Sequence, residues 1–199
     1  MRLNRTLCSS MLACALLVVG GPAFAQEKAP QMSPDAMMEA YHKAAAPGEQ
    51  HKMLEAFVGS WTVTMKAWMA PGQPPTEATG SAEVKSLFGG RFIHEEFHGS
   101  MMGEPFSGIG MTGYDNATKK YVSTWTDSMS TNIMRTEGSY DAAKKAYTYD
   151  ASYVDPLMGP KTMRIVARVI DKDNHVSEFF EPGPDGQWVK MMELAYKRK

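Results

Sequence analysis

Residues 57–66, FVGSWTVTMK, decide the fold of this chain. Every second residue from Phe57 to Met65 is apolar or a glycine, and most of the residues between them carry a hydroxyl group or a charge. Successive side chains of a strand point to opposite faces, so this period of two is typical of a strand with one buried face. The stretch therefore predicts a β-strand rather than a helix.

The strand pattern continues to the end of the chain and is interrupted by residues that favour turns. Nine such breaks separate ten segments rich in Tyr, Trp, Thr, Val and Phe, at residues 71–72, 89–90, 99–103, 115–116, 128–130, 141–144, 155–160, 171–174 and 182–186. No helix separates the segments, so neighbours are expected to pair antiparallel, and an open sheet would leave two long edges. We predict an all-β fold: an antiparallel meander β-barrel of about ten strands with a short N-terminal helical segment.

The first 25 residues have the three parts of a secretory signal peptide. Arg2 and Arg5 form a basic start, residues 11–19 an apolar run, and residues 23–25 (AFA) a cleavage site. The run is shorter than the ~20 residues that span a bilayer, so we expect no transmembrane segment. Cleavage after Ala25 predicts a periplasmic or secreted protein. Cys8 and Cys14 lie in the removed part, so the mature chain would contain no disulfide.

Residues 26–50 are expected to form a linker and helical segment, and residues 51–199 a single β-barrel domain. Ser33 is a suitable N-cap and Pro34 a suitable first helical residue, while Pro47-Gly48 would end the helix. A second short helix, about residues 49–56, would direct Leu54 toward an apolar surface.

The charge balance argues against a nucleic-acid partner. Removal of Arg2 and Arg5 from 21 basic residues leaves 19 against 22 acidic ones, a net charge of −3 with histidines neutral. Nucleic-acid binding requires a basic face, which this composition does not provide. The sequence does not indicate an oligomeric state.

Residues 94–98, HEEFH, match the H-E-x-x-H pattern of zinc hydrolases. On a helix, residues i and i+4 lie on one face and can bind one ion, whereas on a strand they are roughly 13 Å apart. Glycines bound the segment and Phe92, Ile93 and Phe97 favour a strand. We therefore predict no metal site here, with His94 and His98 on an outer face. Glu95, on the face of Ile93 and Phe97, is a candidate buried polar anchor.

The predicted ligand-binding residues follow from the alternation along the strands. They are Trp61, Met65, Tyr114 and Trp125 as cavity lining, with Glu95, Asp127 and Arg135 as polar anchors. A carboxylate beside large rings suits a ligand anchor, but Asp127 at a strand end is also suited to capping the turn at residues 128–130. Gly108 and Gly110 indicate points of close approach in a barrel strand.

The mature sequence contains no recognisable catalytic apparatus. It has no G-x-S-x-G elbow, no phosphate-binding glycine loop and no cysteine nucleophile, so no catalytic residue is assigned. Methionine is abundant, with 17 copies, and soft thioethers can bind Cu(I). Methionine also fills irregular cores and adaptable pockets, which is the simpler interpretation without a repeated array.

Several motifs together resemble a known family. Gly59-Ser60-Trp61 after a short helix is similar to the entry of calycin barrels such as lipocalins and nitrobindins. The stretches HKMLEAFVGSW, GGRFIHEEFHG, GEPFSGIGMTGYDNATKKYVSTWTDS and EGSYD resemble the exported bacterial domain-of-unknown-function family 1579 over about residues 51–199. This resemblance implies a closed barrel with an interior cavity and no assigned reaction.

The nitrobindin resemblance also implies a haem held by a histidine near the end of the chain. The last expected strand, residues 187–199, contains no histidine, and the nearest is His175 at the start of the preceding strand. We therefore predict no cofactor.

These observations favour an exported, non-enzymatic or weakly enzymatic barrel that binds a small, largely apolar molecule. Two alternatives stay open at this level. One is a metal- or haem-dependent enzyme that uses His94, His98 or His175. The other is a structural or envelope-interaction protein with a filled barrel.

Overall fold

A computed structural model describes residues 32–70 and 72–199, so the predicted signal peptide lies outside the described residues. Three short helical elements precede the sheet: α1 (Pro34–Ala45), α2 (Glu49–Lys52) and the 3-10 helix η1 (Met53–Phe57). Ten strands follow: β1 (Gly59–Ala67), β2 (Thr76–Leu87), β3 (Phe92–Met101), β4 (Glu104–Asp115), β5 (Lys120–Asp127), β6 (Met134–Asp141), β7 (Ala146–Asp155), β8 (Gly159–Asp171), β9 (Asn174–Pro182) and β10 (Trp188–Arg198).

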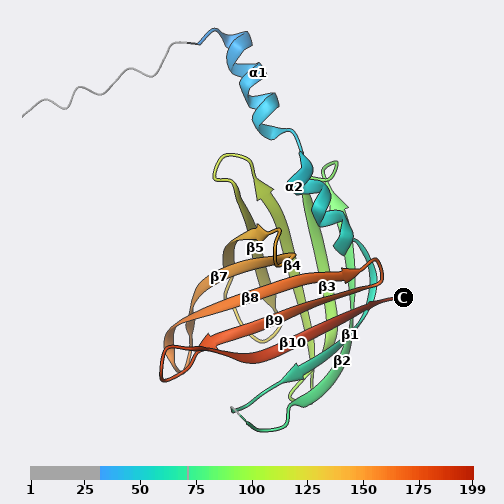
Figure 1. Cartoon of the computed structure of the whole chain (residues 1–199), viewed down its shortest axis with the longest axis vertical. Helices are drawn as coiled ribbons and strands as arrows, with labels where there is room; N and C mark the ends of the chain where they lie inside the picture. Colours follow the sequence, from blue (N-terminus) through green and yellow to red (C-terminus); the bar gives the residue numbers. More distant parts are fainter. Residues whose placement is uncertain (1–31, 71) are drawn as a thin grey trace, which may run out of the picture.

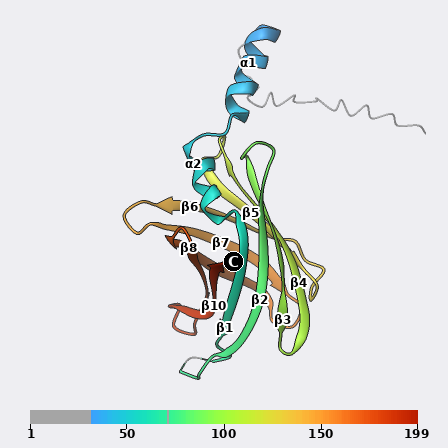
Figure 2. The same cartoon turned by 90° about the vertical axis from the view of Figure 1, so that its right-hand side faces the viewer.

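The ten strands form one closed antiparallel barrel, as the sequence predicts (Figures 1 and 2). Each strand pairs with its neighbours in the chain, and β1 closes the sheet by pairing with β10. The closing register runs from Trp61 opposite Arg198 to Ala67 opposite Met192. Closure removes both edges of the sheet, which is how a long meander avoids unpaired backbone groups.

The HEEFH stretch is part of strand β3, as predicted. Glu95 pairs with Val84 on one side and with Gly110 on the other. His94 and Glu96 lie together on the opposite face, with 3.7 Å between His94 Nδ1 and Glu96 Oε1. The helical geometry that H-E-x-x-H needs is therefore absent at this stretch.

The N-terminal helix begins where the sequence predicts. The Ser33 hydroxyl accepts a hydrogen bond from the Ala36 backbone N–H at 3.2 Å, and Pro34 is the first helical residue. The structure describes all of α1, and none of its residues is buried. It contacts the barrel near its C-terminal end, where Arg91 and Asn116 donate hydrogen bonds to carbonyl groups of residues 44–46.

The second helical segment covers one end of the barrel. Leu54 of η1 is 1% exposed and packs in a cluster with Tyr121 and Tyr147. The hydroxyl groups of these two tyrosines donate to the carbonyl oxygens of Gln50 and Met53. Within the described ranges, no helix is long and apolar enough to cross a membrane.

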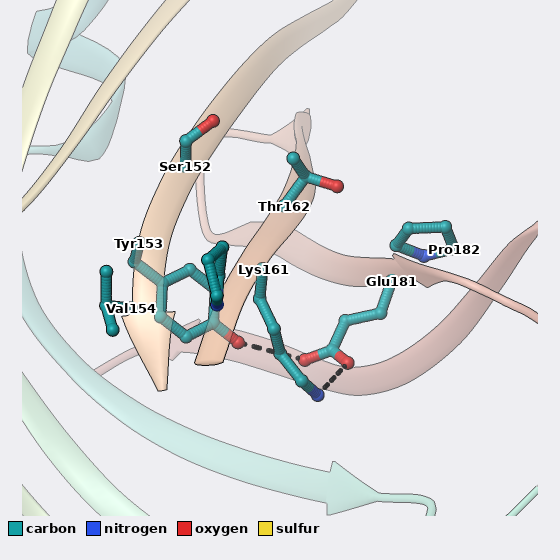
Figure 3. A pocket seen from close by; sticks show the side chains of 8 residues that line it. Ser152, Tyr153, Val154, Lys161, Thr162, Glu181 and Pro182 are labelled. Carbon is teal, nitrogen blue, oxygen red and sulfur yellow. Dashed lines mark hydrogen bonds and ion pairs between the residues drawn. The ribbon is translucent and has the colours of Figure 1, made fainter. Parts of the chain in front are cut away.

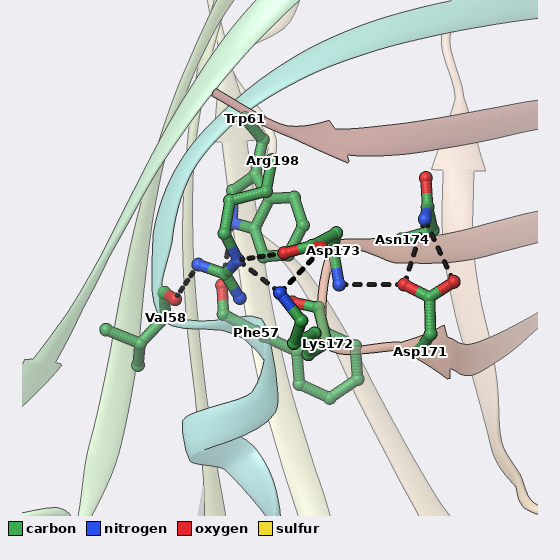
Figure 4. A network of polar contacts seen from close by, with 8 residues as sticks. All are labelled: Phe57, Val58, Trp61, Asp171, Lys172, Asp173, Asn174 and Arg198. Atoms are coloured by element: carbon green, nitrogen blue, oxygen red, sulfur yellow. Dashed lines mark hydrogen bonds and ion pairs between the residues drawn. The ribbon is translucent and has the colours of Figure 1, made fainter.

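The same end of the barrel is locked by the pair Trp61 and Arg198 (Figure 4). The guanidinium lies over the indole ring at 4.1 Å, and it donates to the carbonyl oxygens of Val58 and Lys172 at 2.9 Å each. Gly59 has a φ of +140°, and a Cβ there would lie 2.1 Å from Arg198 Nη1. The glycine therefore supplies both the backbone conformation and the space that the arginine needs.

Replacing Arg198 by alanine is expected to lower the free energy of unfolding by about 2–3 kcal/mol, because two charge-assisted hydrogen bonds and a cation–π contact are lost. Chemical denaturation followed by tryptophan fluorescence measures the change. Lys197→Ala, at an exposed position next to it, is the control and should change stability by less than about 0.5 kcal/mol. Equal effects of the two variants would show that Arg198 does not lock this end.

Candidate ligand-binding cavity

The barrel encloses a cavity of about 910 Å³. Leu54 and Phe57 of the helical cover line one end, and the β5–β6 loop lines the other. These two segments lie at opposite ends of the antiparallel strands. Met129 is 53% exposed and Val154 is 68% exposed, and both belong to the lining. The cavity therefore opens to solvent at the end opposite η1.

The walls of the cavity are mainly apolar and rich in methionine. Six methionines line it: Met65, Met101, Met129, Met134, Met163 and Met192. Phenylalanines and aliphatic side chains fill much of the remaining wall, with hydroxyl groups from residues such as Thr112, Ser123 and Ser177. Unbranched thioether side chains adapt to ligands of different shape, so this lining suits an apolar molecule.

Glu95 is the most deeply placed carboxyl group in the cavity wall. Its Oε1 accepts a hydrogen bond from the Tyr196 hydroxyl at 3.0 Å. Among the described residues, Oε2 has no hydrogen-bond partner, and part of the side chain stays accessible from the cavity. Burial raises the pKa of the Glu95 carboxyl, and the hydrogen bond from Tyr196 opposes that shift.

His175 lies behind Tyr196 in an aromatic enclosure. Its ring stacks on Tyr196 with centroids 4.0 Å apart, and Trp61 and Phe57 meet it edge-on at 4.5 and 5.0 Å. Neither ring nitrogen has a hydrogen-bond partner in the part of the chain that the structure describes. Burial, with a smaller contribution from the charge of Arg198, lowers the pKa of His175 to about 3. The imidazole is therefore neutral at pH 7.

Trp125 lies flat against β4 because Gly108 and Gly110 of that strand carry no side chains under its ring. A Cβ at Gly108 would lie 2.1 Å from Trp125 Cζ2, and one at Gly110 would lie 3.2 Å from Cε3. The prediction that these glycines mark a close approach is confirmed. Trp125 Nε1 donates to Asp127 Oδ2 at 3.1 Å, while Asp127 Oδ1 accepts from the Met129 backbone N–H. Asp127 therefore both borders the cavity and caps the turn.

The structure brings four of the seven predicted ligand-binding residues to the cavity. They are Met65, Glu95, Trp125 and Asp127. Trp61 is 1% exposed and lies in the closed end under Arg198, while Tyr114 packs between His51 and Tyr121.

Arg135 lies on the outer face of β6 and pairs with Glu137 at 2.7 Å. Its side chain is 62% exposed, so it is placed outside the cavity. The reason is the strand period: Thr136 and Met134 of the same strand are the inward residues. Arg164 likewise pairs with Asp150 and does not reach Glu95 or Asp127.

Two residues of the cavity wall were not singled out by the sequence, Tyr196 and Ser177, and the aromatic enclosure of His175 was not predicted either. Tyr196 has a usable signal, because it continues the inward series Met192 and Leu194 on the last strand. Its contact with Glu95 joins strands 101 residues apart, which local periodicity does not report.

A shallow second pocket of about 510 Å³ lies at the barrel rim beside the mouth of the cavity (Figure 3). Glu181 accepts hydrogen bonds from Tyr153 at 3.1 Å and Lys161 at 2.8 Å. Tyr153 and Val154 belong to both pockets. The ammonium group of Lys161 is therefore paired with Glu181 at this rim.

Histidines and carboxylates do not converge on a metal site. Over residues 32–70 and 72–199, no three His, Cys, Asp or Glu side chains are grouped so as to hold an ion. His94 and His98 lie on the outer face of β3, whereas His175 is inside the barrel. The three histidines named in the enzyme alternative therefore do not share one site.

A closed antiparallel barrel with an interior cavity is the class of protein that this fold and this site define. The family model described as "Protein of unknown function (DUF1579)" matches residues 46–198, and the chain therefore belongs to that family. The curated proteins include no match to this sequence.

One of two similar solved structures supports the fold. The crystal structure of Rv2717c from M. tuberculosis has a TM-score of 0.54 and 12% identity, over 77% of this chain and 99% of that one. A redesigned β barrel has a TM-score of 0.37 and 15% identity, over 73% of this chain and 93% of that one. At this identity the first likeness shows a common barrel fold and nothing about a ligand.

The haem that the nitrobindin resemblance implies does not fit this arrangement. His175 is the histidine that lines the cavity, but both of its ring nitrogens are fully covered by neighbouring atoms. An iron atom must approach a ring nitrogen along its lone pair, and Trp61, Phe57 and Tyr196 enclose this ring.

Acid is expected to destabilise the protein through His175. The pKa of this imidazole is lowered from 6.5 to about 3 in the folded state, so the unfolded chain binds a proton first as the pH falls. The free energy of unfolding therefore decreases as the pH falls from about 6.5 to about 3, with a slope of up to about 1.4 kcal/mol per pH unit. His175→Phe should remove this slope from urea denaturation curves.

The control for this prediction is His42→Phe on the exposed helix α1, which should keep the acid sensitivity of the wild type. The same slope in His175→Phe and wild type would contradict the assignment to His175.

Proposed function

We propose that this protein is an exported barrel that binds a small, largely apolar molecule in its interior. The observation that carries the proposal is the cavity of about 910 Å³, open at one end and lined mainly by apolar side chains. Ligand sites in proteins are commonly concave, mostly apolar and supplied with a few polar groups, and this cavity has that composition.

The cavity has enough apolar wall to hold a ligand by burial alone. A molecule that loses roughly 300 Å² of apolar surface gains about 7.5 kcal/mol before the cost of association, at ~25 cal/mol/Å². A purely structural barrel has less support, because an interior filled by side chains would be more stable than a hollow one. The empty volume lowers the stability of the fold and provides space for a ligand.

A cavity-filling substitution tests the proposal. Ser177 lines the cavity on β9, so Ser177→Trp is expected to place an indole in it and to weaken binding of the neutral fluorophore Nile red at least about tenfold. The measurement is a fluorescence titration. Ser139→Trp, on the exposed face of β6, is the matched control and should bind the dye as the wild type does.

Two results of this titration would count against a binding cavity. One is the absence of Nile red binding to the wild type. The other is equal binding by the two tryptophan variants while both unfold cooperatively.

The location is part of the proposal and has its own test. Residues 1–25 have the order of a signal peptide, with a cleavage site before Gln26. The full chain expressed in a Gram-negative cell should be recovered from the periplasm with an intact mass that begins at Gln26. Recovery of the uncleaved chain in the cytoplasmic fraction would refute export.

A further inference from the structure

The cavity wall has an unbalanced charge. Glu95, Asp127 and Asp155 belong to its lining, and no lysine or arginine of the described chain does. Two basic groups close to the barrel ends have other partners, because Lys161 pairs with Glu181 at the rim and Arg198 lies over the Trp61 ring. An anionic ligand would therefore enter without a counter-charge, whereas a cationic one would meet acceptors at both the mouth and the inner end.

Glu95 is available for such a contact. One carboxyl oxygen accepts from Tyr196 at 3.0 Å, and Oε2 has no partner among the described side chains. Oε2 faces the cavity, where a ligand group can reach it. Burial raises the pKa of this carboxyl group, and an ammonium group beside it would favour the charged form.

Aromatic side chains lie on the same wall of the cavity as Glu95. Phe97 and Trp125 belong to or pack against the same buried cluster as Tyr196. Trp125 and Glu95 flank the same glycine, since a Cβ at Gly110 would lie 3.2 Å from the indole and 3.7 Å from the Glu95 Cβ. A carboxylate combined with the faces and edges of aromatic rings favours an organic ammonium group, which gains cation–π attraction in addition to the ion pair.

We propose that the cavity binds an apolar primary amine head first, with its ammonium group donating to Glu95 Oε2 and its hydrocarbon part along the methionine-rich wall. The inference rests on the proposed function of the cavity as a ligand site. The head enters first because the cavity opens at the β5–β6 loop, while Glu95 lies toward the end covered by η1. A ligand with the same hydrocarbon part but a carboxylate head group should bind more weakly, because the acidic lining repels it.

Three probes with one hydrocarbon chain test the charge preference: n-octylamine, n-octanol and n-octanoate, each titrated by calorimetry at pH 7.5. We expect octylamine to bind at least about tenfold more tightly than octanol and octanoate to bind more weakly than octanol. Glu95→Gln keeps the shape and the acceptor for Tyr196 but removes the charge. It should weaken octylamine binding at least about tenfold and leave octanol binding within about twofold.

Glu96→Gln is the matched control, because Glu96 is the next residue on the outer face of β3. It should change none of the three affinities. Similar affinities of octylamine and octanol, or loss of both in Glu95→Gln, would overturn the amine proposal while leaving the apolar cavity in place. If none of the three probes binds the wild type, the amine proposal fails together with the proposed function.

Discussion

Closure of β1 against β10 is the constraint on which the rest of the structure depends. Those two strands are the ends of the meander, so their pairing turns a sheet with two open edges into a barrel with an inside. Trp61 links that seam to the helical cover, since its indole N–H donates to the Phe57 carbonyl oxygen at 2.8 Å. The Arg198 guanidinium lies over the Trp61 ring. It donates hydrogen bonds to the carbonyl oxygens of Val58, in the loop before β1, and Lys172, in the loop before β9.

The locked end differs from the rest of the interior in residue size. Toward η1, tyrosines pack on one another, with Tyr121 and Tyr147 at 5.0 Å and nearly perpendicular. Their hydroxyl groups reach backbone carbonyl groups of the cover, so the large rings are buried without unpaired oxygens. Further along the strands the inward positions include small residues such as Ser123, Thr112 and Ser177. These small side chains leave part of the space that the cavity occupies.

The sequence predicted the barrel because its signals are local. The alternation from Phe57 to Met65 and the turn residues between segments are both visible within windows of about ten residues. The observed strands and turns agree with both signals. The inward direction of Glu95 also followed from its position between Ile93 and Phe97. By contrast, Arg135 was proposed as an anchor although the strand period directs it outward, beside Thr136. Applying the alternation to every strand would have excluded it.

Sequence periodicity does not predict the contacts of Glu95, the proposed ligand anchor. Tyr196 and Glu95 lie on β10 and β3, which are not neighbours in the sheet, so their hydrogen bond crosses the interior. The enclosure of His175 on β9 is also a long-range feature. Its neighbours Trp61, Phe57 and Tyr196 come from β1, η1 and β10. Such contacts across the interior depend on the shear and closure of the barrel, which alternation within one strand does not specify.

Glu95 and His175 also show how a fold can be less stable than its composition allows. A buried carboxyl group without a basic partner and an imidazole with two unpaired nitrogens each cost on the order of 1–3 kcal/mol relative to a satisfied or apolar group. The aromatic enclosure of His175 explains why that ring stays, since it fills space between Trp61 and Tyr196. No such packing role explains the free oxygen of Glu95, which faces the cavity. In the proposed complex the ammonium group of the ligand would offset this cost, and for this reason the proposal rests on the carboxyl group rather than on the histidine.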